Sequence, residues 1–233
     1  MKRWLAHNKG FVVFLLCFGV FRTAIADWNP IPSGSMRPTL LEGDVVFVNR
    51  LAYNIKLPLT DIVIAPLSDP QRGDIVTFSS PRDGTRLIKR IVGVPGDRVE
   101  MRGDTLTVNG VAARYDALWQ APDPVAPGRT LDSVHATEHL AGSERSVQFL
   151  PAVHARRDMA ALVVPPGHYF MLGDNRDNSA DSRYFGFFPR SEVMGRTRRV
   201  AYSLDPDHFY LPRIDRFGVA LDAVAAAAKL PAY

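Results

Sequence analysis

The chain has almost no cysteine. Cys17 is the only one among 233 residues, so a disulfide within the chain is impossible and cysteine usage does not identify a compartment. Long apolar runs are also scarce: the one strongly apolar N-terminal segment, residues 10–21 without a charge, is only 12 residues long. A strong charge of one sign is missing too, since 28 Lys and Arg against 24 Asp and Glu leave a net charge of +4. No recognised nucleic-acid-binding module accompanies that excess, so DNA or RNA binding is unsupported.

What the chain does contain is typical of a globular protein. Apolar residues make up 46% of it and charged residues 22%, which argues against extensive disorder. A length of 233 residues accommodates one large domain, or one domain with an appended subdomain. Basic clusters such as residues 196–199 are more often solvated than functional, and the alternative is that they lie on an anionic membrane surface.

The N-terminal segment fits two interpretations. Basic residues precede the apolar run, and Ala24-Ile-Ala26 resembles a small-x-small cleavage site, which together are typical of a secretory signal peptide. A retained anchor over residues 1–27 is the interpretation we favour, because Trp4 and Trp28 flank the segment like interfacial aromatics and Arg22 could extend its charge to the interface. In both cases the basic start predicts a cytoplasmic N-terminus, with the remainder on the other side.

From residue 28 onward the sequence has the pattern of short β-strands. Runs rich in β-branched and aromatic residues are bounded by Gly, Pro, Asp and Asn. Pro95-Gly96 suits a type II turn, and Asn109-Gly110 suits a type I′ hairpin turn. The expected strands lie at residues 44–48, 74–78, 86–94, 105–108, 168–172 and 200–203.

The body divides into three parts by composition. Residues 111–165 contain proline-rich pieces and fewer apolar runs, which predicts an inserted smaller subdomain between core segments 28–110 and 166–233. An alanine-rich tail over residues 217–229 predicts a short helix, too short for a second membrane span.

A candidate nucleophile lies in residues 31–40, IPSGSMRPTL. Ser35 occupies a Pro/Gly-rich turn, which presents a hydroxyl to solvent better than it builds a core. A serine hydroxyl is a weak nucleophile until a base takes its proton. Histidine is the usual base, but there is none in residues 31–40 or in the two other candidate segments, 87–97 and 173–183. The alternative role for Ser35 is that of an ordinary turn or capping serine.

Lysine is the available base. Lys89 lies in the expected strand 86–94, where alternation places it on one face with Leu87 and Ile91, and burial among apolar groups lowers the pKa of a lysine. Arg90 falls on the opposite face and stays protonated, so base chemistry selects Lys89 where alternation alone does not. An ordinary strand lysine is the competing interpretation.

The third segment is the dense polar run 173–183, GDNRDNSADSR, directly after apolar residues. Burying such a run costs free energy unless its side chains satisfy one another. A calcium loop does not fit, because Arg176 occupies a ligand position and no glutamate closes the loop. A solvated polar loop remains the simpler alternative.

In order and character the three segments resemble the signature boxes of the type I signal peptidases, membrane-bound serine proteases that remove secretory signal peptides. The resemblance implies Ser35 as nucleophile, Lys89 as general base, and an oxyanion hole formed by the Ser33 hydroxyl and the Ser35 backbone N–H. It also implies that Ser179 orients the lysine amine. Asp181 and Arg183 would brace the site, and Gly173 would allow a close backbone approach.

The same resemblance implies the remaining expectations. The fold should be mostly β, with an N-terminal transmembrane helix, an antiparallel catalytic domain and the inserted subdomain. Substrates should be the signal peptides of preproteins with small residues at −1 and −3, as in Ala-x-Ala. The enzyme should be a monomer without metal or cofactor, contacting lipid at the bacterial inner (plasma) membrane with its catalytic domain outside the cytoplasm. Candidate pocket residues are Ile31, Pro32, Met36, Leu40, Leu87 and Ile88.

Rival interpretations remain open. His135-Ala-Thr-Glu-His139 matches the metalloprotease pattern H-x-x-E-H, although two surface histidines explain it more simply. A specialised Ser/Lys enzyme, such as a conjugative pilin-maturing peptidase or a self-cleaving repressor, is possible within the same chemistry. The non-enzymatic alternative is an anchored β-rich binding domain.

Overall fold

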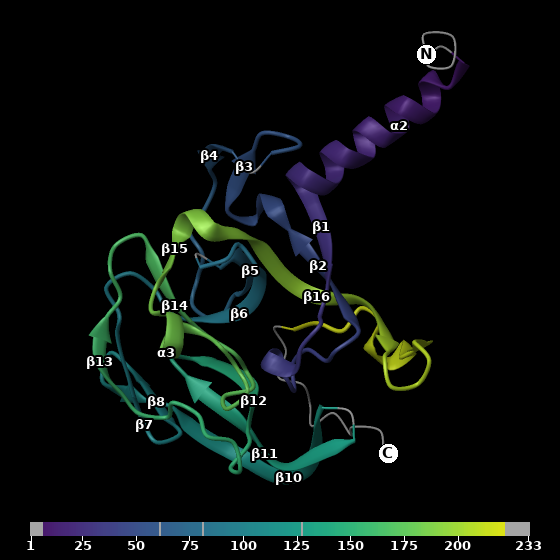
Figure 1. Cartoon of the computed structure of the whole chain (residues 1–233). Coiled ribbons are helices and arrows are strands. Elements are labelled where there is room, and N and C mark those ends of the chain that lie inside the picture. The colour runs from purple at the N-terminus through teal and green to yellow at the C-terminus, as the bar shows by residue number, and fades with distance from the viewer. Residues whose placement is uncertain (1–6, 61, 81, 127, 222–233) are drawn as a thin grey trace.

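The computed structural model describes residues 7–60, 62–80, 82–126 and 128–221 (Figure 1). Its centre is an antiparallel sheet in the order β1-β2-β16-β5-β6-β14-β15, with β17 paired to β16. These strands are β1 (Ala26–Pro30), β2 (Asp44–Asn49), β5 (Ile75–Ser79), β6 (Arg86–Gly93), β14 (His168–Leu172), β15 (Phe188–Pro189), β16 (Val193–Asp205) and β17 (Leu211–Pro212).

Three smaller sheets complete the β structure. A four-stranded sheet contains β13 (Met159–Val163), β7 (Arg98–Arg102), β8 (Thr105–Val108) and β9 (Val111–Ala112), and a three-stranded sheet contains β10 (Arg114–Ala126), β11 (Arg129–Leu140) and β12 (Ser143–Phe149). The third is a hairpin of β3 (Asn54–Lys56) and β4 (Val63–Pro66). We call the β10–β11 hairpin, residues 114–140, the arm; it runs along the lower edge of the molecule in Figure 1.

Helical structure is sparse among the described residues. The longest helix is α2 (Lys9–Val20), followed by a π-helical turn at Phe21–Ile25 and then directly by β1. A short helix, α3 (Ser182–Phe185), ends the polar run, and single 3-10 turns connect strands elsewhere. No helix in the described ranges has both the length and the apolarity to cross a membrane, which differs from the transmembrane helix expected over residues 1–27. Residues 1–6 of that segment lie outside the described ranges.

The mostly β, antiparallel expectation is confirmed, and all six predicted strands appear within a residue of the expected ends or inside longer strands. Both predicted turns form as well. Asp97 donates its backbone N–H to the Val94 carbonyl across Pro95-Gly96, with φ of +88° at Gly96. Asn109 and Gly110 have φ of +53° and +80°, as a type I′ turn requires.

Residues 111–165 form long strands that their composition did not predict. The arm's prolines interrupt the expected strand pattern, yet they lie in β10, an edge strand where a missing N–H is tolerated. The tail differs from expectation too. Residues 217–221 are not helical, since Ala220 forms a β-bridge with Arg199, and the rest of the predicted helix lies outside the described ranges.

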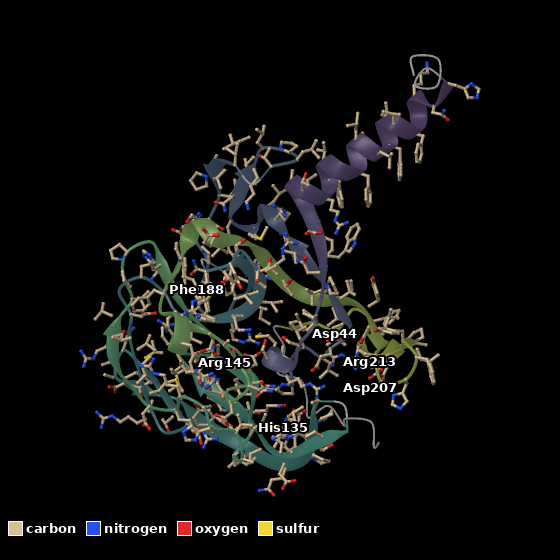
Figure 2. The ribbon with its side chains drawn as sticks, in the orientation of Figure 1. Asp44, His135, Arg145, Phe188, Asp207 and Arg213 are labelled. Carbon is tan, nitrogen blue, oxygen red and sulfur yellow. The ribbon has the colours of Figure 1, made fainter. Side chains whose placement is uncertain are left out.

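A buried charge cluster joins the arm to the polar run. Glu138 of β11 is fully buried and accepts hydrogen bonds or ion pairs from Arg145 of β12, Arg176 of the run and the Tyr115 hydroxyl. The two guanidinium groups outweigh the effect of burial and lower the pKa of Glu138 to about 2. The cluster holds the run against the arm, whose position Figure 2 marks with His135; Arg145 is labelled on the neighbouring strand β12.

Replacing Glu138 by Ala is expected to destabilise the protein by about 3–5 kcal/mol, because Arg145 and Arg176 would be left buried without a carboxylate. The measurement is the free energy of unfolding in urea. Glu144→Ala is the control, since its side chain is 56% exposed and its loss should cost less than about 1 kcal/mol. Equal effects of the two substitutions would contradict the role given to the cluster.

Candidate active site

The nucleophile turn is a single 3-10 turn, Gly34–Met36, that follows the end of β1. Two hydrogen bonds from Asn175 fix it: the side-chain amide donates to the Gly34 carbonyl at 3.0 Å, and the backbone N–H donates to the Ser35 carbonyl at 3.2 Å. Met36 is fully buried and anchors the turn in the core. Ser35 itself stays half-buried, so its hydroxyl is accessible at a fixed position.

Lys89 meets Ser35 directly. The Nζ atom lies 2.7 Å from Ser35 Oγ and also donates to the Ile88 carbonyl at 2.9 Å. The two residues are 54 positions apart in sequence, so β6 and the turn after β1 must pack together to create this contact. Lys89 is only 3% exposed, as the strand pattern predicted.

Burial lowers the pKa of the Lys89 amine to about 8, because the charged form loses its hydration. Asp181 and Asp174 act in the opposite direction and favour the charged amine, while Arg183 adds to the lowering. The balance leaves a substantial fraction of neutral amine near neutral pH. A neutral lysine 2.7 Å from a serine hydroxyl can accept its proton, so the pair can generate a nucleophile.

The Ser33 hydroxyl is exposed and lies 3.5 Å from Ser35 Oγ. It therefore borders the space that a carbonyl attacked by Ser35 would occupy, alongside the Ser35 N–H. Donors so placed can stabilise a developing oxyanion.

The polar run packs against the backbone of the nucleophile turn and against the surroundings of Lys89. Asp181 is buried, receives two hydrogen bonds from the Arg183 guanidinium at 2.8 and 2.9 Å, and accepts a third from the Gly173 backbone N–H at 3.0 Å. A Cβ atom at Gly173 would lie 2.6 Å from the Ser179 Cβ and closer still to the Ser35 carbonyl oxygen. The expected close backbone approach at Gly173 is thus present.

Ser179 departs from its expected role. Its hydroxyl is buried beside Gly173 but forms no hydrogen bond with any described atom. The Lys89 amine is held by Ser35 and the Ile88 carbonyl instead. In this structure Ser179 therefore borders the lysine's surroundings without orienting its amine.

The six residues expected to line a substrate pocket do not lie on one surface. Met36 and Leu40 are fully enclosed in a core cluster with Ile31, so the expectation that they form pocket walls is wrong. Leu87 packs against a different core cluster. Ile31 and Pro32 border an open groove, and Ile88 lies half-buried beside the first cluster.

Sequence reasoning missed a second layer of the site. Asp174 accepts two hydrogen bonds from Arg90, at 2.7 and 2.9 Å, and one from Thr39 at 2.6 Å. These bonds tie β6, the polar run and the nucleophile segment together. Arg90 cannot act as a base, but its buried charge requires a carboxylate, and the density of acidic residues in the polar run is the sequence signal that points to one.

The H-x-x-E-H segment lies on strand β11, where its residues serve other contacts. His135 is buried, stacks on Trp119 at 3.9 Å between ring centroids and hydrogen-bonds Ser133, so the expectation of a surface histidine is wrong there. His139 pairs with Asp116 and Glu144. Within the described ranges no three His, Cys, Asp or Glu side chains cluster as a metal site would require.

The sequence model of one protein family, described as "Signal peptidase, peptidase S26", matches residues 2–202 of the chain. The chain belongs to this family. A signal peptidase I of Pseudomonas aeruginosa is 37% identical over 227 residues, which cover 91% of this chain and 78% of the relative. One from Pseudomonas fluorescens is 36% identical with the same coverage.

Other relatives of this signal peptidase family member carry the same name. A signal peptidase I of Buchnera aphidicola is 32% identical and covers 89% of this chain and 79% of its own. A solved signal peptidase I from Enterococcus faecalis is 37% identical over 56% of this chain and 97% of its own, with a TM-score of 0.33.

The lowered pKa of Lys89 predicts the pH dependence of this signal peptidase family member. Activity should rise about tenfold per pH unit below pH 8 and level off above it, because only the neutral amine can take the serine proton. The measurement is kcat/KM for a peptide substrate between pH 6 and 10, with the folded fraction followed in parallel. A rate that is flat from pH 6 to 9 in folded protein would rule out a titrating lysine base.

Proposed function

We propose that this protein is a signal peptidase I, a serine endopeptidase that removes N-terminal signal peptides from secreted preproteins after Ala-x-Ala sites. The observation that carries the proposal is the 2.7 Å contact between Ser35 Oγ and the buried amine of Lys89. Family membership supports a peptidase, and this contact supports the residues that perform the reaction.

The proposed cycle uses one proton acceptor twice. Ser35 Oγ attacks the scissile carbonyl carbon while Lys89 Nζ takes the hydroxyl proton, and the Ser35 N–H with the Ser33 hydroxyl stabilises the oxyanion. The C–N bond breaks as Lys89 returns the proton to the leaving amine, which leaves an acyl-enzyme. Water then gives a proton to Lys89 as its oxygen attacks the acyl carbon. The bond to Ser35 Oγ breaks, Lys89 returns the proton to that oxygen, and the signal peptide leaves with a new carboxyl group. Asp181, Arg183 and Gly173 keep the dyad in place, with Ser179 beside it.

Two unpaired strand edges support binding of an extended substrate. β1 pairs only with β2, and residues 86–89 of β6 pair only with β5 in the described ladders. Arg86 joins the two edges by donating to Asp27 at 3.0 Å and Asn29 at 2.7 Å. A signal peptide segment that enters as a strand between them would reach Ser35 with its cleavage site. Ile31 and Ile88 border that position, and such apolar walls favour small side chains at −1 and −3.

We further propose that the enzyme works at the bacterial plasma membrane, with a cytoplasmic N-terminus and the catalytic domain outside. Apolar side chains of α2 are exposed all along the helix, including Phe11, Phe14 and Leu15 at 57%, 60% and 48%. The β3–β4 hairpin lies at the same end of the molecule and exposes Leu59 and Ile64 as well (Figure 1). Contact with lipid would cover this surface.

The division into a catalytic core of residues 28–110 and 166–233 with an insertion at 111–165 is part of the same proposal. The monomeric state also belongs to it. The insertion would carry the arm, which supports the site through Glu138 and Arg176.

Cleavage of a purified preprotein with an Ala-x-Ala site tests the proposed function. Wild-type protein should cut at that site with or without EDTA, whereas Ser35→Ala and Lys89→Ala should lose the activity while remaining folded, because each removes half of the dyad. Product mass identifies the cut. Activity that survives Ser35→Ala but disappears with EDTA would assign the chemistry to a metal site instead.

Lipid contact through α2 has its own test. Replacing both Phe14 and Leu15 by Glu should lower binding to vesicles of anionic phospholipid more than tenfold, because each buried apolar side chain contributes about 1.5–3 kcal/mol. Co-flotation with the vesicles gives the bound fraction. Leu118→Glu is the control, since Leu118 is 64% exposed on the arm, far along the chain from α2. Equal flotation of both variants would reject the contact.

A further inference from the structure

A groove of about 920 Å³ lies beside the nucleophile turn and has no part in the chemistry described above. One wall is the end of β1 and its continuation, with Ile31 and Pro32. The arm supplies Pro124 and Val125, and the loop after β16 supplies Pro206 and Tyr210. Three segments that are far apart in sequence thus enclose one open channel.

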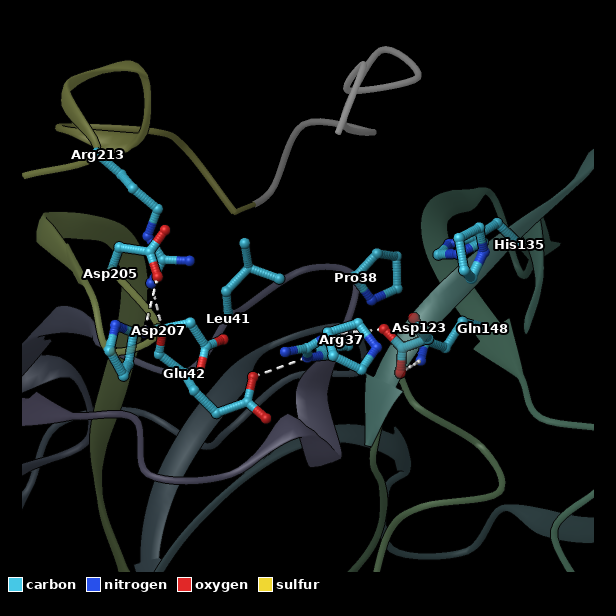
Figure 3. A pocket seen from close by; sticks show the side chains of 13 residues that line it. Arg37, Pro38, Leu41, Glu42, Asp123, His135, Gln148, Asp205, Asp207 and Arg213 are labelled. Atoms are coloured by element: carbon cyan, nitrogen blue, oxygen red, sulfur yellow. Dashed lines mark hydrogen bonds and ion pairs between the residues drawn. The ribbon is translucent and has the colours of Figure 1, made fainter. Parts of the chain in front are cut away.

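The floor of the groove is held by one arginine. Arg37, two residues after Ser35, donates to Glu42 at 2.7 Å and to Asp123 of the arm at 2.6 Å (Figure 3). The same three side chains line a smaller cavity next to the groove. Because both carboxylates already occupy Arg37, its charge fastens the arm to the nucleophile segment and leaves little attraction for a charged ligand.

Strand direction decides what would reach this groove. Four successive antiparallel pairings connect β1 to β6 through β2, β16 and β5, so β1 and β6 run in the same direction. Both lead from the end near α2, where Arg86 meets Asp27, toward Ser35 and Lys89. A substrate strand that runs parallel to them brings its N-terminal part past α2 and its scissile bond to Ser35. The chain that follows the bond then continues past the end of β1, beyond the −1 position that Ile31 borders, into the groove.

The chemistry of the walls differs from that of the strand edges. Prolines have no backbone N–H and cannot extend a β-ladder to a bound peptide. Five of them line the groove: Pro30, Pro32, Pro122, Pro124 and Pro206. The proline positions therefore give a bound peptide no N–H donors, and we expect recognition to depend on side-chain packing, with Val125 and Tyr210 as partners.

We propose that this groove binds the first residues of the mature protein, those that follow the scissile bond, and selects apolar or aromatic side chains among them. The inference rests on the proposed function, because it assigns the mature side of the same substrate. It adds a second recognition site to the one between β1 and β6. The first site binds the signal peptide by backbone hydrogen bonds, and the second binds the mature segment by side-chain contacts.

Two peptides test the proposal. Both carry the same signal segment and Ala-x-Ala site, and both end in an amide; one stops two residues after the cut and the other continues for about ten, with aromatic residues in the extension. Wild-type enzyme should show a kcat/KM at least about tenfold higher for the longer peptide. Val125→Trp, which narrows the groove from the side of the arm, should reduce that gain and leave the short peptide unaffected.

Matched variants distinguish an effect on the groove from a general loss of folding or activity. Leu118→Trp adds the same bulk to the same strand outside the groove, and should retain the gain. If Val125→Trp does not fold, Tyr210→Ala replaces it in the test. This substitution removes part of the groove wall at an exposed position and should also reduce the gain. Equal cleavage of both peptides by wild type, or an undiminished gain in folded Val125→Trp, would overturn the inference. Failure to cut either peptide would instead reject the proposed function.

Discussion

The burial of one lysine amine against one serine hydroxyl is the constraint on which the rest of the structure depends. An amine buried as deeply as Lys89 is costly when charged, and that cost brings its pKa to about 8. The serine can lose its proton to such an amine only if the two atoms stay in contact. Every neighbouring element serves to hold them there: β6 carries Lys89, and Asn175 fixes the turn that carries Ser35.

Buried charges hold this arrangement in place, at a cost in desolvation free energy. The run from Gly173 to Arg183 is almost entirely enclosed, and its charges have partners: Asp174 with Arg90, Arg176 with Glu138, Asp177 with Arg157, and Asp181 with Arg183. Such pairs add less net stability than their contacts suggest, because desolvation opposes them. Their value lies in geometry, since breaking one leaves a buried charge that only the native arrangement satisfies.

Buried ion pairs also hold the arm, which forms one wall of the groove that we propose for the substrate. Arg37 ties it to the nucleophile segment through Asp123, and Glu138 ties it to the polar run. A segment whose composition suggested a variable insertion is therefore connected to both halves of the site. Its prolines, which obscured the strand, also give the groove walls positions that have no backbone N–H to donate to a peptide.

The sequence by itself determined six of the strands and the two turns, and it identified Ser35 and Lys89 as candidates, because alternation, Gly and Pro positions and base chemistry are local properties of the chain. It did not reveal the long strands of the arm, the enclosure of Met36 and Leu40, or the Asp174–Arg90 pair. Those depend on which distant segments pack together. Only the tertiary structure brought Ser35 within 2.7 Å of Lys89, because a contact across 54 positions forms through sheet pairing and buried ion pairs that no local pattern encodes.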